Sequence, residues 1–295
     1  MKKHLKIVCV ILAVLLAVSL GFIGFTAFFG GDSLFWTTYL QSPSELYTME
    51  SGILYNDLEF REGEDYRFTY DFSSEDYEKL RSQYRLEELA QTGSEFERAR
   101  NLMNAFAGRL THKGDYDNHV PMRALELLEY SLDNKKQGIN CRSKAQILNE
   151  MCLSLGIYAR KVWIMPNSVY DNDCHVVNEV WDSAGQKWVM LDITNNTYWV
   201  DSEGNPLSIL EIREKAAKQE FCTPIDAGKP ETEPEKALND NYGNFLYIVK
   251  NLVYMQYCDT YTTEESENFY ILFPRNLDTE YEYIISREAV EAAPE

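Results

Sequence analysis

Three residues whose side chains could together perform thiol chemistry are Cys141, His175 and Asp192. Cys141 follows residues 138–140 and opens a stretch in which apolar residues recur at helical spacing. A helix N-terminus exposes free backbone N–H groups and a partial positive charge, which stabilise a thiolate and lower the thiol pKa. The Cys141 N–H could also stabilise an oxyanion on an attacked carbonyl. Taken alone, a cysteine at the start of a helix is more often structural.

A β-hairpin is predicted to bring His175 and Asp192 to one face of a sheet. Residues 175–181 and 187–193 have the pattern of its two strands, with a turn centred on residues 184–185. In this register Asp192 is the diagonal neighbour of His175, at a spacing of about 7–8 Å. A slip of one residue would send the two side chains to opposite faces.

The same register pairs Trp181 with Trp188, an apolar cross-strand contact that supports it. A carboxylate beside His175 would fix the tautomer of the imidazole and support its protonated form. In isolation, His175 could be a partly buried strand histidine and Asp192 a turn former at a strand end. Their shared register, downstream of a cysteine at a helix start, favours the catalytic interpretation. The opposite face of the hairpin is predicted to be buried through Val176, Val180, Val189, Leu191 and Ile193.

Two stretches around these residues, GINCRSKAQILNEMCLSLGIYARKVWIMP and CHVVNEVWDSAGQKWVMLDIT, resemble the core of the transglutaminase-like superfamily. The similarity lies in the glycine before the cysteine helix, the Gly-Ile-x-Ala-Arg-x-Val segment, the histidine strand and the Trp-Val-x-Leu-Asp motif. It covers roughly residues 95–200. The sequence departs from the family pattern at Ile193, where proline is usual, and at Asn140, which separates the glycine from the cysteine.

The resemblance implies a papain-like fold in which Cys141, His175 and Asp192 form the catalytic triad. The implied reaction is acyl transfer, in which the thiolate attacks an amide carbonyl and a thioester forms; water or a second amine then resolves it. No metal or other cofactor is needed for this chemistry, and the acidic residues 171–173 are interpreted as a turn. A second oxyanion donor is not identifiable; the candidates are His112, Asn118 and His119, although all three suit solvent-exposed loop positions.

The order of predicted elements is that of an α+β protein in which the catalytic helix packs on an antiparallel sheet. Capping boxes at Ser94 and Ser208 mark two helix starts. The predicted helices span residues 75–91, 94–110, 121–133, 141–155, 208–218 and 241–257, and strands outside the hairpin span 66–72, 157–165, 268–273 and 280–285. The predicted organisation is an N-terminal extension over 31–94, a catalytic core over 95–222, an exposed Pro- and Glu-rich linker over 223–240 and C-terminal helix and strands over 241–295.

Residues 1–30 are predicted to form a membrane anchor. Basic residues precede residues 7–29, an uncharged run of 23 residues that would extend about 35 Å as a helix, enough for a hydrocarbon core of roughly 30 Å. The run is longer than the apolar part of most cleaved signal peptides and ends without a small-x-small site, although cleavage remains an alternative. The preceding lysines place the rest of the chain outside the cytoplasm.

The net charge of −19, without a basic stripe, argues against nucleic acid as a partner. Of the six cysteines, Cys9 falls in the apolar run, so an odd number remains and at least one thiol is unpaired within the chain. Cys152 falls on the buried side of its predicted helix, and Cys174 is interpreted as a packing residue. The sequence lacks the C-x-x-C pairs of zinc ribbons and thioredoxin motifs.

The sequence therefore favours a membrane-anchored, extracytoplasmic thiol enzyme that acts on amides of proteins, peptides or cell-wall material. One alternative is a catalytically silent peptide- or cell-wall-binding module on the same scaffold. Another is an ectodomain whose tail, residues 223–295, docks a partner while the core supports it.

Overall fold

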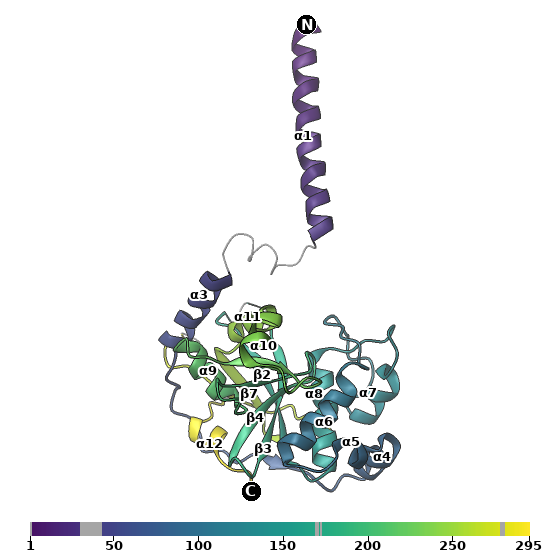
Figure 1. Ribbon diagram of the computed structural model, residues 1–295, viewed down its shortest axis with the longest axis vertical. Helices are drawn as coiled ribbons and strands as arrows, with labels where there is room; N and C mark the ends of the chain where they lie inside the picture. The colour runs from purple at the N-terminus through teal and green to yellow at the C-terminus, as the bar shows by residue number, and fades with distance from the viewer. Residues whose placement is uncertain (1, 30–42, 169–170, 172, 278–280) are drawn as a thin grey trace. The chain divides into compact units, whose positions relative to one another are not determined.

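The computed structural model describes residues 2–29, 43–168, 171, 173–277 and 281–295 (Figure 1). The chain divides into two compact units, Met1–Met49 and Glu50–Glu295. Helix α1 (Lys2–Phe29) belongs to the first, and α3 (Pro43–Asn56) follows it in the chain. The membrane-spanning helix that the sequence predicts is not found among the described residues, where no helix is long and apolar enough to cross a membrane.

The second unit is built on a sheet in which the described residues form seven strands, all paired antiparallel, in the order β6-β5-β4-β3-β2-β7-β9. This confirms the predicted α+β class with an antiparallel sheet. The strands are β2 (Ala159–Met165), β3 (His175–Asp182), β4 (Lys187–Asp192), β5 (Thr197–Val200), β6 (Thr223–Asp226), β7 (Tyr254–Cys258) and β9 (Phe269–Leu272).

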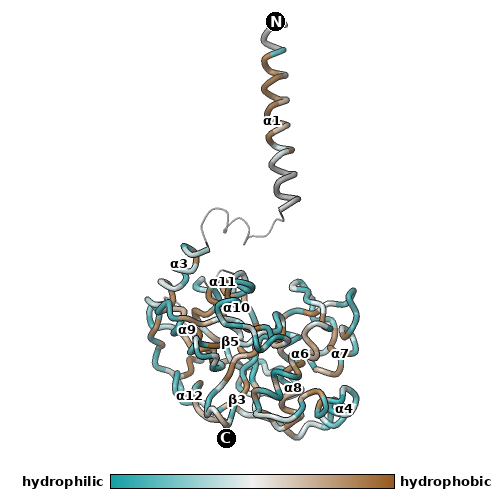
Figure 2. The backbone as a smooth tube through the Cα atoms, in the orientation of Figure 1, coloured by the Kyte–Doolittle hydropathy of each residue, from teal (hydrophilic) through white to brown (hydrophobic). Residues whose placement is uncertain are grey.

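Helix α8 (Cys141–Ser154) packs against β2 and β3, and α6 (Glu95–Ala107) packs beside it on β3 and β4 (Figure 1). The apolar residues of these helices meet the inward side chains of the strands in one buried cluster. Figure 2 shows hydrophobic residues along this interior and hydrophilic residues toward the loops. The capping box predicted at Ser94 is present and fixes the start of α6.

The hairpin has the predicted register. Trp181 lies opposite Trp188, and the ladder continues to Asn178 opposite Leu191. Val180, Val189 and Leu191 are buried in the cluster against α8, as their common face requires. His175 is the first residue of β3 and Asp192 the last residue of β4, so the hairpin carries both to the same end of the sheet.

Where the sequence predicts an exposed linker over residues 223–240, the structure has a strand and a helix. Strand β6 begins at Thr223 and pairs along its length with β5, with Ile225 in the core. Pro234 then occupies the first turn of α10 (Pro234–Asp240), where its missing N–H costs no hydrogen bond. The composition, rich in Pro and Glu, therefore does not predict the short buried strand and the helix that this segment forms.

The C-terminal segment is also part of this sheet. Helix α11 (Tyr242–Lys250) ends earlier than predicted, and β7 follows and pairs with β2. Strand β9 agrees with the predicted strand at 268–273. The predicted strand at 280–285 is reduced to two isolated bridges, Ile284 with Ile271 and Ile285 with Glu64, and residue 280 lies outside the described range.

Other predicted elements are shorter or broken. The strand predicted at 66–72 is only β1 (Thr69–Tyr70), paired in parallel with β8 (Thr260–Tyr261). The helix predicted at 75–91 is interrupted where Arg85 adopts a left-handed φ of 54°. The helix predicted from Pro121 starts later. The remaining helices are α4 (Asp76–Tyr84), α5 (Leu86–Ala90), α7 (Ala124–Ser131), α9 (Ile209–Ala217) and α12 (Arg287–Glu291).

Candidate active site

The start of α8 is fixed by Asn140, the residue that separates the glycine from the cysteine. Its side-chain Oδ1 accepts hydrogen bonds from the backbone N–H and the hydroxyl of Ser143, both at 2.9 Å. This is an N-cap, so Cys141 becomes the first residue of the helix, where the N–H has no carbonyl one turn earlier. The departure from the family pattern therefore supplies the cap that places the cysteine.

Gly138 allows a second segment to approach this helix start. A Cβ at this position would lie 2.8 Å from the Lys113 Cβ and 3.0 Å from the Thr111 carbonyl oxygen. The close approach lets Ile139 donate to the Thr111 carbonyl at 3.0 Å and accept from the Lys113 N–H at 2.9 Å. The segment around His112 is thereby held beside the start of α8.

Cys141 is half-buried, and His175 lies close enough to act on the pKa of its thiol. Burial opposes ionisation of the thiol and is the largest single influence on its pKa. The hydrogen bond and charge of His175, with a hydrogen bond from the Val176 N–H, outweigh that burial and lower the pKa below its ordinary value. A lowered thiol pKa favours the thiolate form of Cys141 near neutral pH.

His175 meets Asp192 on its other side. The His175 Nε2 lies 2.9 Å from the Asp192 Oδ2, and the two side chains are only 4% and 0% exposed. Burial favours the neutral imidazole, but the charge and hydrogen bond of Asp192, together with Cys141, raise the pKa of His175 to about 10. Burial likewise opposes the charge on Asp192, yet His175 and Asn195 lower its pKa overall. Because Nε2 faces the carboxylate, Nδ1 remains for the thiol.

The carboxylate of Asp192 is held by two residues that the sequence analysis did not single out. The Asn195 side-chain Nδ2 donates to Asp192 Oδ2 at 2.7 Å, and the N–H groups of Thr194 and Asn195 donate to Oδ1 at 2.9 and 3.3 Å. An Asp followed by polar residues at a strand end is the only sequence signal for this turn. The turn orients the carboxylate toward the imidazole.

The three oxyanion candidates occupy different surroundings. His112 is electrostatically coupled to Lys144, His175 and Asp192, which places it beside the triad; burial and the two neighbouring cationic groups lower its pKa. His119 instead lies against Tyr116 and Tyr130 and pairs with Asp117. Asn118 is exposed in a loop and has a left-handed φ of 53°. Among the described residues, His112 is thus the candidate whose pKa responds to the charges of His175 and Asp192.

The loop before His175 is tied to the C-terminal helix. Lys250 Nζ lies 3.1 Å from the Asp171 Oδ2 and 3.0 Å from the Asp173 Oδ2. These carboxylates are engaged with a cation of the chain, and Asn172 lies outside the described residues. In the described part of the chain, no group of three His, Cys, Asp or Glu side chains is arranged to hold a metal ion.

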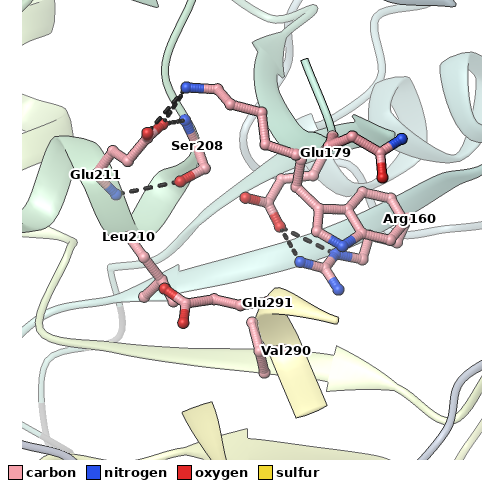
Figure 3. A pocket seen from close by; sticks show the side chains of 10 residues that line it. Arg160, Glu179, Ser208, Leu210, Glu211, Val290 and Glu291 are labelled. Carbon is pink, nitrogen blue, oxygen red and sulfur yellow. Dashed lines mark hydrogen bonds and ion pairs between the residues drawn. The ribbon is translucent and has the colours of Figure 1, made fainter. Parts of the chain in front are cut away.

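A second buried ion pair lies farther along the same strands. The Arg160 Nε and Nη2 donate to Glu179 Oε2 at 2.9 and 2.6 Å (Figure 3). The other oxygen of Glu179 accepts from the Ile209 N–H at 3.1 Å. The guanidinium carbon of Arg160 lies 3.9 Å from the Trp188 ring centroid. A cavity of about 190 Å³ adjoins the pair. The pair joins β2, β3 and the start of α9, and no triad residue lines this cavity.

The described site is thus a thiol at a helix start, packed on an antiparallel sheet that carries a hydrogen-bonded His–Asp pair, an arrangement consistent with a papain-like core. Residues 83–193 match the model of the transglutaminase-like superfamily, so this part of the chain is a domain of that superfamily. The matched range starts earlier and ends earlier than the predicted core at 95–222.

Among solved structures, the chain is similar to a protein from Cytophaga hutchinsonii described as a candidate cysteine protease. The two are 14% identical over 50% of this chain, with a TM-score of 0.32. The chain spans about half of that protein, 48% of its length. No curated protein matches the sequence.

Proposed function

We propose that this protein is a thiol enzyme that performs acyl transfer or hydrolysis at an amide bond. The observation that carries the proposal is the chain of contacts from Cys141 through His175 to Asp192, with the thiol pKa lowered and the imidazole pKa raised. A superfamily domain over residues 83–193 supports the same class of chemistry.

In the proposed reaction, the Cys141 thiolate attacks the carbonyl carbon of an amide and forms a tetrahedral oxyanion. The carbon–nitrogen bond then breaks while the His175 imidazolium gives its proton to the departing nitrogen, which leaves a thioester on Cys141. Water or a primary amine attacks the thioester, and neutral His175 accepts the proton of that nucleophile. The thiolate leaves and the thiolate–imidazolium pair is restored. Asp192 stabilises the charged imidazole throughout.

The proposed substrates are amides of proteins, peptides or cell-wall material, and the partner that resolves the thioester decides the outcome. An amine gives a crosslinked or transferred product, whereas water gives hydrolysis or deamidation. Acyl transfer requires that the site exclude water after the thioester forms.

The test is to incubate the full chain with a library of glutamine- and peptide-bond-containing amides, with and without a primary amine. We expect mass spectrometry to find an acyl adduct on Cys141 that hydroxylamine removes, and Cys141→Ser to abolish adduct and product. Peptide binding that is unchanged in Cys141→Ser, together with no turnover of any amide in the library, would replace this proposal with the silent binding module.

We also propose that the catalytic unit is tethered outside the cytoplasm through residues 1–30. The support is the uncharged run at 7–29 that follows the basic residues Lys2, Lys3 and Lys6. The test is membrane fractionation of cells that express the full chain and a chain lacking residues 1–30, followed by protease treatment of intact cells. Recovery of the full chain in the soluble cytoplasmic fraction would contradict the tether.

A further inference from the structure

Tyr247, a residue of α11, lies against His175. The two ring centroids are 5.5 Å apart with an interplanar angle of 70°, an edge-to-face arrangement. Tyr247 is also close enough to Cys141 for the charge on the thiolate to influence its hydroxyl. The imidazole is therefore bounded by three groups: the carboxylate of Asp192, the thiol of Cys141 and the ring of Tyr247.

The hydroxyl of Tyr247 is anchored to the loop that leads into β3. It donates to the Asp173 Oδ1 at 3.1 Å and lies 3.5 Å from the Cys174 carbonyl oxygen. The other oxygen of Asp173 is held by Lys250, less than one turn later on the same helix. Burial and the neighbouring Asp173 raise the pKa of Tyr247, so the hydroxyl keeps its proton and remains a donor.

These contacts form a clamp, defined here as Tyr247 and Lys250 of α11 with Asp171 and Asp173 of the loop. The clamp fixes the backbone immediately before His175 and places a rigid ring against the imidazole. Its helix lies beyond residues 83–193, the range that matches the superfamily model. The C-terminal segment thus adds a contact to the His–Asp pair that the matched domain does not contain.

We propose that Tyr247 is a positioning residue for His175: its ring limits rotation of the imidazole so that Nδ1 stays on the Cys141 thiol while Nε2 stays on Asp192. This rests on the proposed function, since it assigns a role to the same triad. Small misplacements of reacting groups cost rate steeply. A clamp that restricts the imidazole should therefore act on the rate of thiolate chemistry more than on substrate binding.

The experiment measures the rate of Cys141 alkylation by iodoacetamide in the full chain as a function of pH, with thermal unfolding as a check on folding. The titratable groups that act on His175 are Asp192 from β4, Cys141 from α8 and His112. Lys144 of α8 acts on Asp192 and Cys141, and all four groups stay unchanged in the variants. The variants are Tyr247→Ala, Tyr247→Phe and the control Tyr242→Ala, whose ring stacks on Phe245 in the same helix.

Tyr247→Ala is expected to slow alkylation at neutral pH by about tenfold or more and to move the acidic limb of the profile to higher pH, because the imidazolium no longer stays on the thiolate. Tyr247→Phe keeps the ring but loses the bond to Asp173, so its rate constant should lie between the wild type and Tyr247→Ala. Tyr242→Ala should retain the wild-type profile.

The inference is overturned if Tyr247→Ala reacts like the wild type, if Tyr247→Phe is as slow as Tyr247→Ala, or if Tyr242→Ala slows alkylation equally. Failure of the proposed function gives a different result. In that case Cys141 of the wild type would already react no faster than an ordinary exposed thiol, and His175→Ala would leave its rate unchanged.

Discussion

Two of the buried ion pairs on the sheet differ in what surrounds them. His175–Asp192 and Arg160–Glu179 are both almost inaccessible, and Glu179 lies on the same strand as His175, four residues along. Arg160 and Glu179 are directly opposite each other within the ladder between β2 and β3. His175 and Asp192 instead occupy the first residue of β3 and the last residue of β4.

Position along the strand decides which groups each pair can meet. Within the ladder, Arg160 and Glu179 meet the rings of Phe68, Trp188 and Tyr257 and a helix N–H, groups that hold a charge in place without reacting. At the strand ends, His175 meets the thiol at the start of α8. Burying charge is costly for both pairs. What differs is the group beside each pair: aromatic rings surround the structural pair, whereas a thiol lies beside the candidate catalytic pair.

The side-chain types agree with that division. An arginine stays charged at every physiological pH, and here the charge of Glu179 helps to raise its pKa further even though burial, the largest influence, opposes it. An imidazole can lose and regain a proton within a reaction. The difference between the two pairs is therefore that the His–Asp pair has a member that can exchange a proton and lies at the strand ends near the Cys141 thiol.

The largest expected effect follows from Asp192→Asn. An amide cannot stabilise the imidazolium and favours the wrong tautomer, so turnover should fall by about 10⁴, as for a comparable triad. The measurement is kcat on the amide identified by the adduct experiment. A loss of less than tenfold, in a variant that still folds, would remove Asp192 from the triad.

The corresponding change in the structural pair is Glu179→Ala. It leaves Arg160 buried without its carboxylate, which should cost about 3–5 kcal/mol in the free energy of unfolding. The folded fraction should keep its kcat. Urea unfolding measures the loss, and the exposed Asp240 of the Lys236–Asp240 pair supplies a control, since Asp240→Ala should cost less than about 0.5 kcal/mol. A Glu179→Ala variant that is as stable as the wild type but inactive would show that Arg160–Glu179 is not merely a structural pair.

Alkaline pH should titrate only one of the two pairs. The raised pKa of His175, about 10, means that its contribution to stability is complete below the ordinary histidine pKa of about 6.5 and is lost as pH rises through the folded value. Turnover should therefore fall near pH 10 as the imidazolium loses its proton, while circular dichroism still reports a folded chain. On the acidic side, the lowered pKa of Cys141 should keep turnover high below the ordinary thiol pKa of about 8.5. Unfolding that coincides with the alkaline loss of activity would contradict this prediction.

The smallest expected effect belongs to Asn195→Ala. It removes one hydrogen bond to Asp192 Oδ2, while the two backbone donors to Oδ1 remain. We expect kcat to fall about tenfold, which corresponds to about 1.4 kcal/mol, with KM unchanged. Equal kcat in the variant and the wild type would mean that the backbone turn alone orients the carboxylate.

Local signals in the sequence were enough to predict the hairpin register and the helix that begins near Cys141. The alternation of β3 and β4 set the hairpin register, because a slip would expose the apolar face and bury the polar one, and the cap at Asn140 begins the helix at Cys141. Those elements depend on short-range chemistry. The Pro- and Glu-rich composition at 223–240 misled because β6 is stabilised by pairing with β5 rather than by its own propensity.

What the sequence by itself determined was the identity of the three candidate residues and the elements that bear them. Only the tertiary structure decided which neighbours complete their surroundings: Asn195 on the carboxylate, the segment of His112 beside Gly138, and Tyr247 against the imidazole. The last two come from parts of the chain distant from the residues they contact. The physical reason is that these contacts depend on how whole helices and strands pack against each other. The periodicity of a single segment carries no information about such long-range contacts.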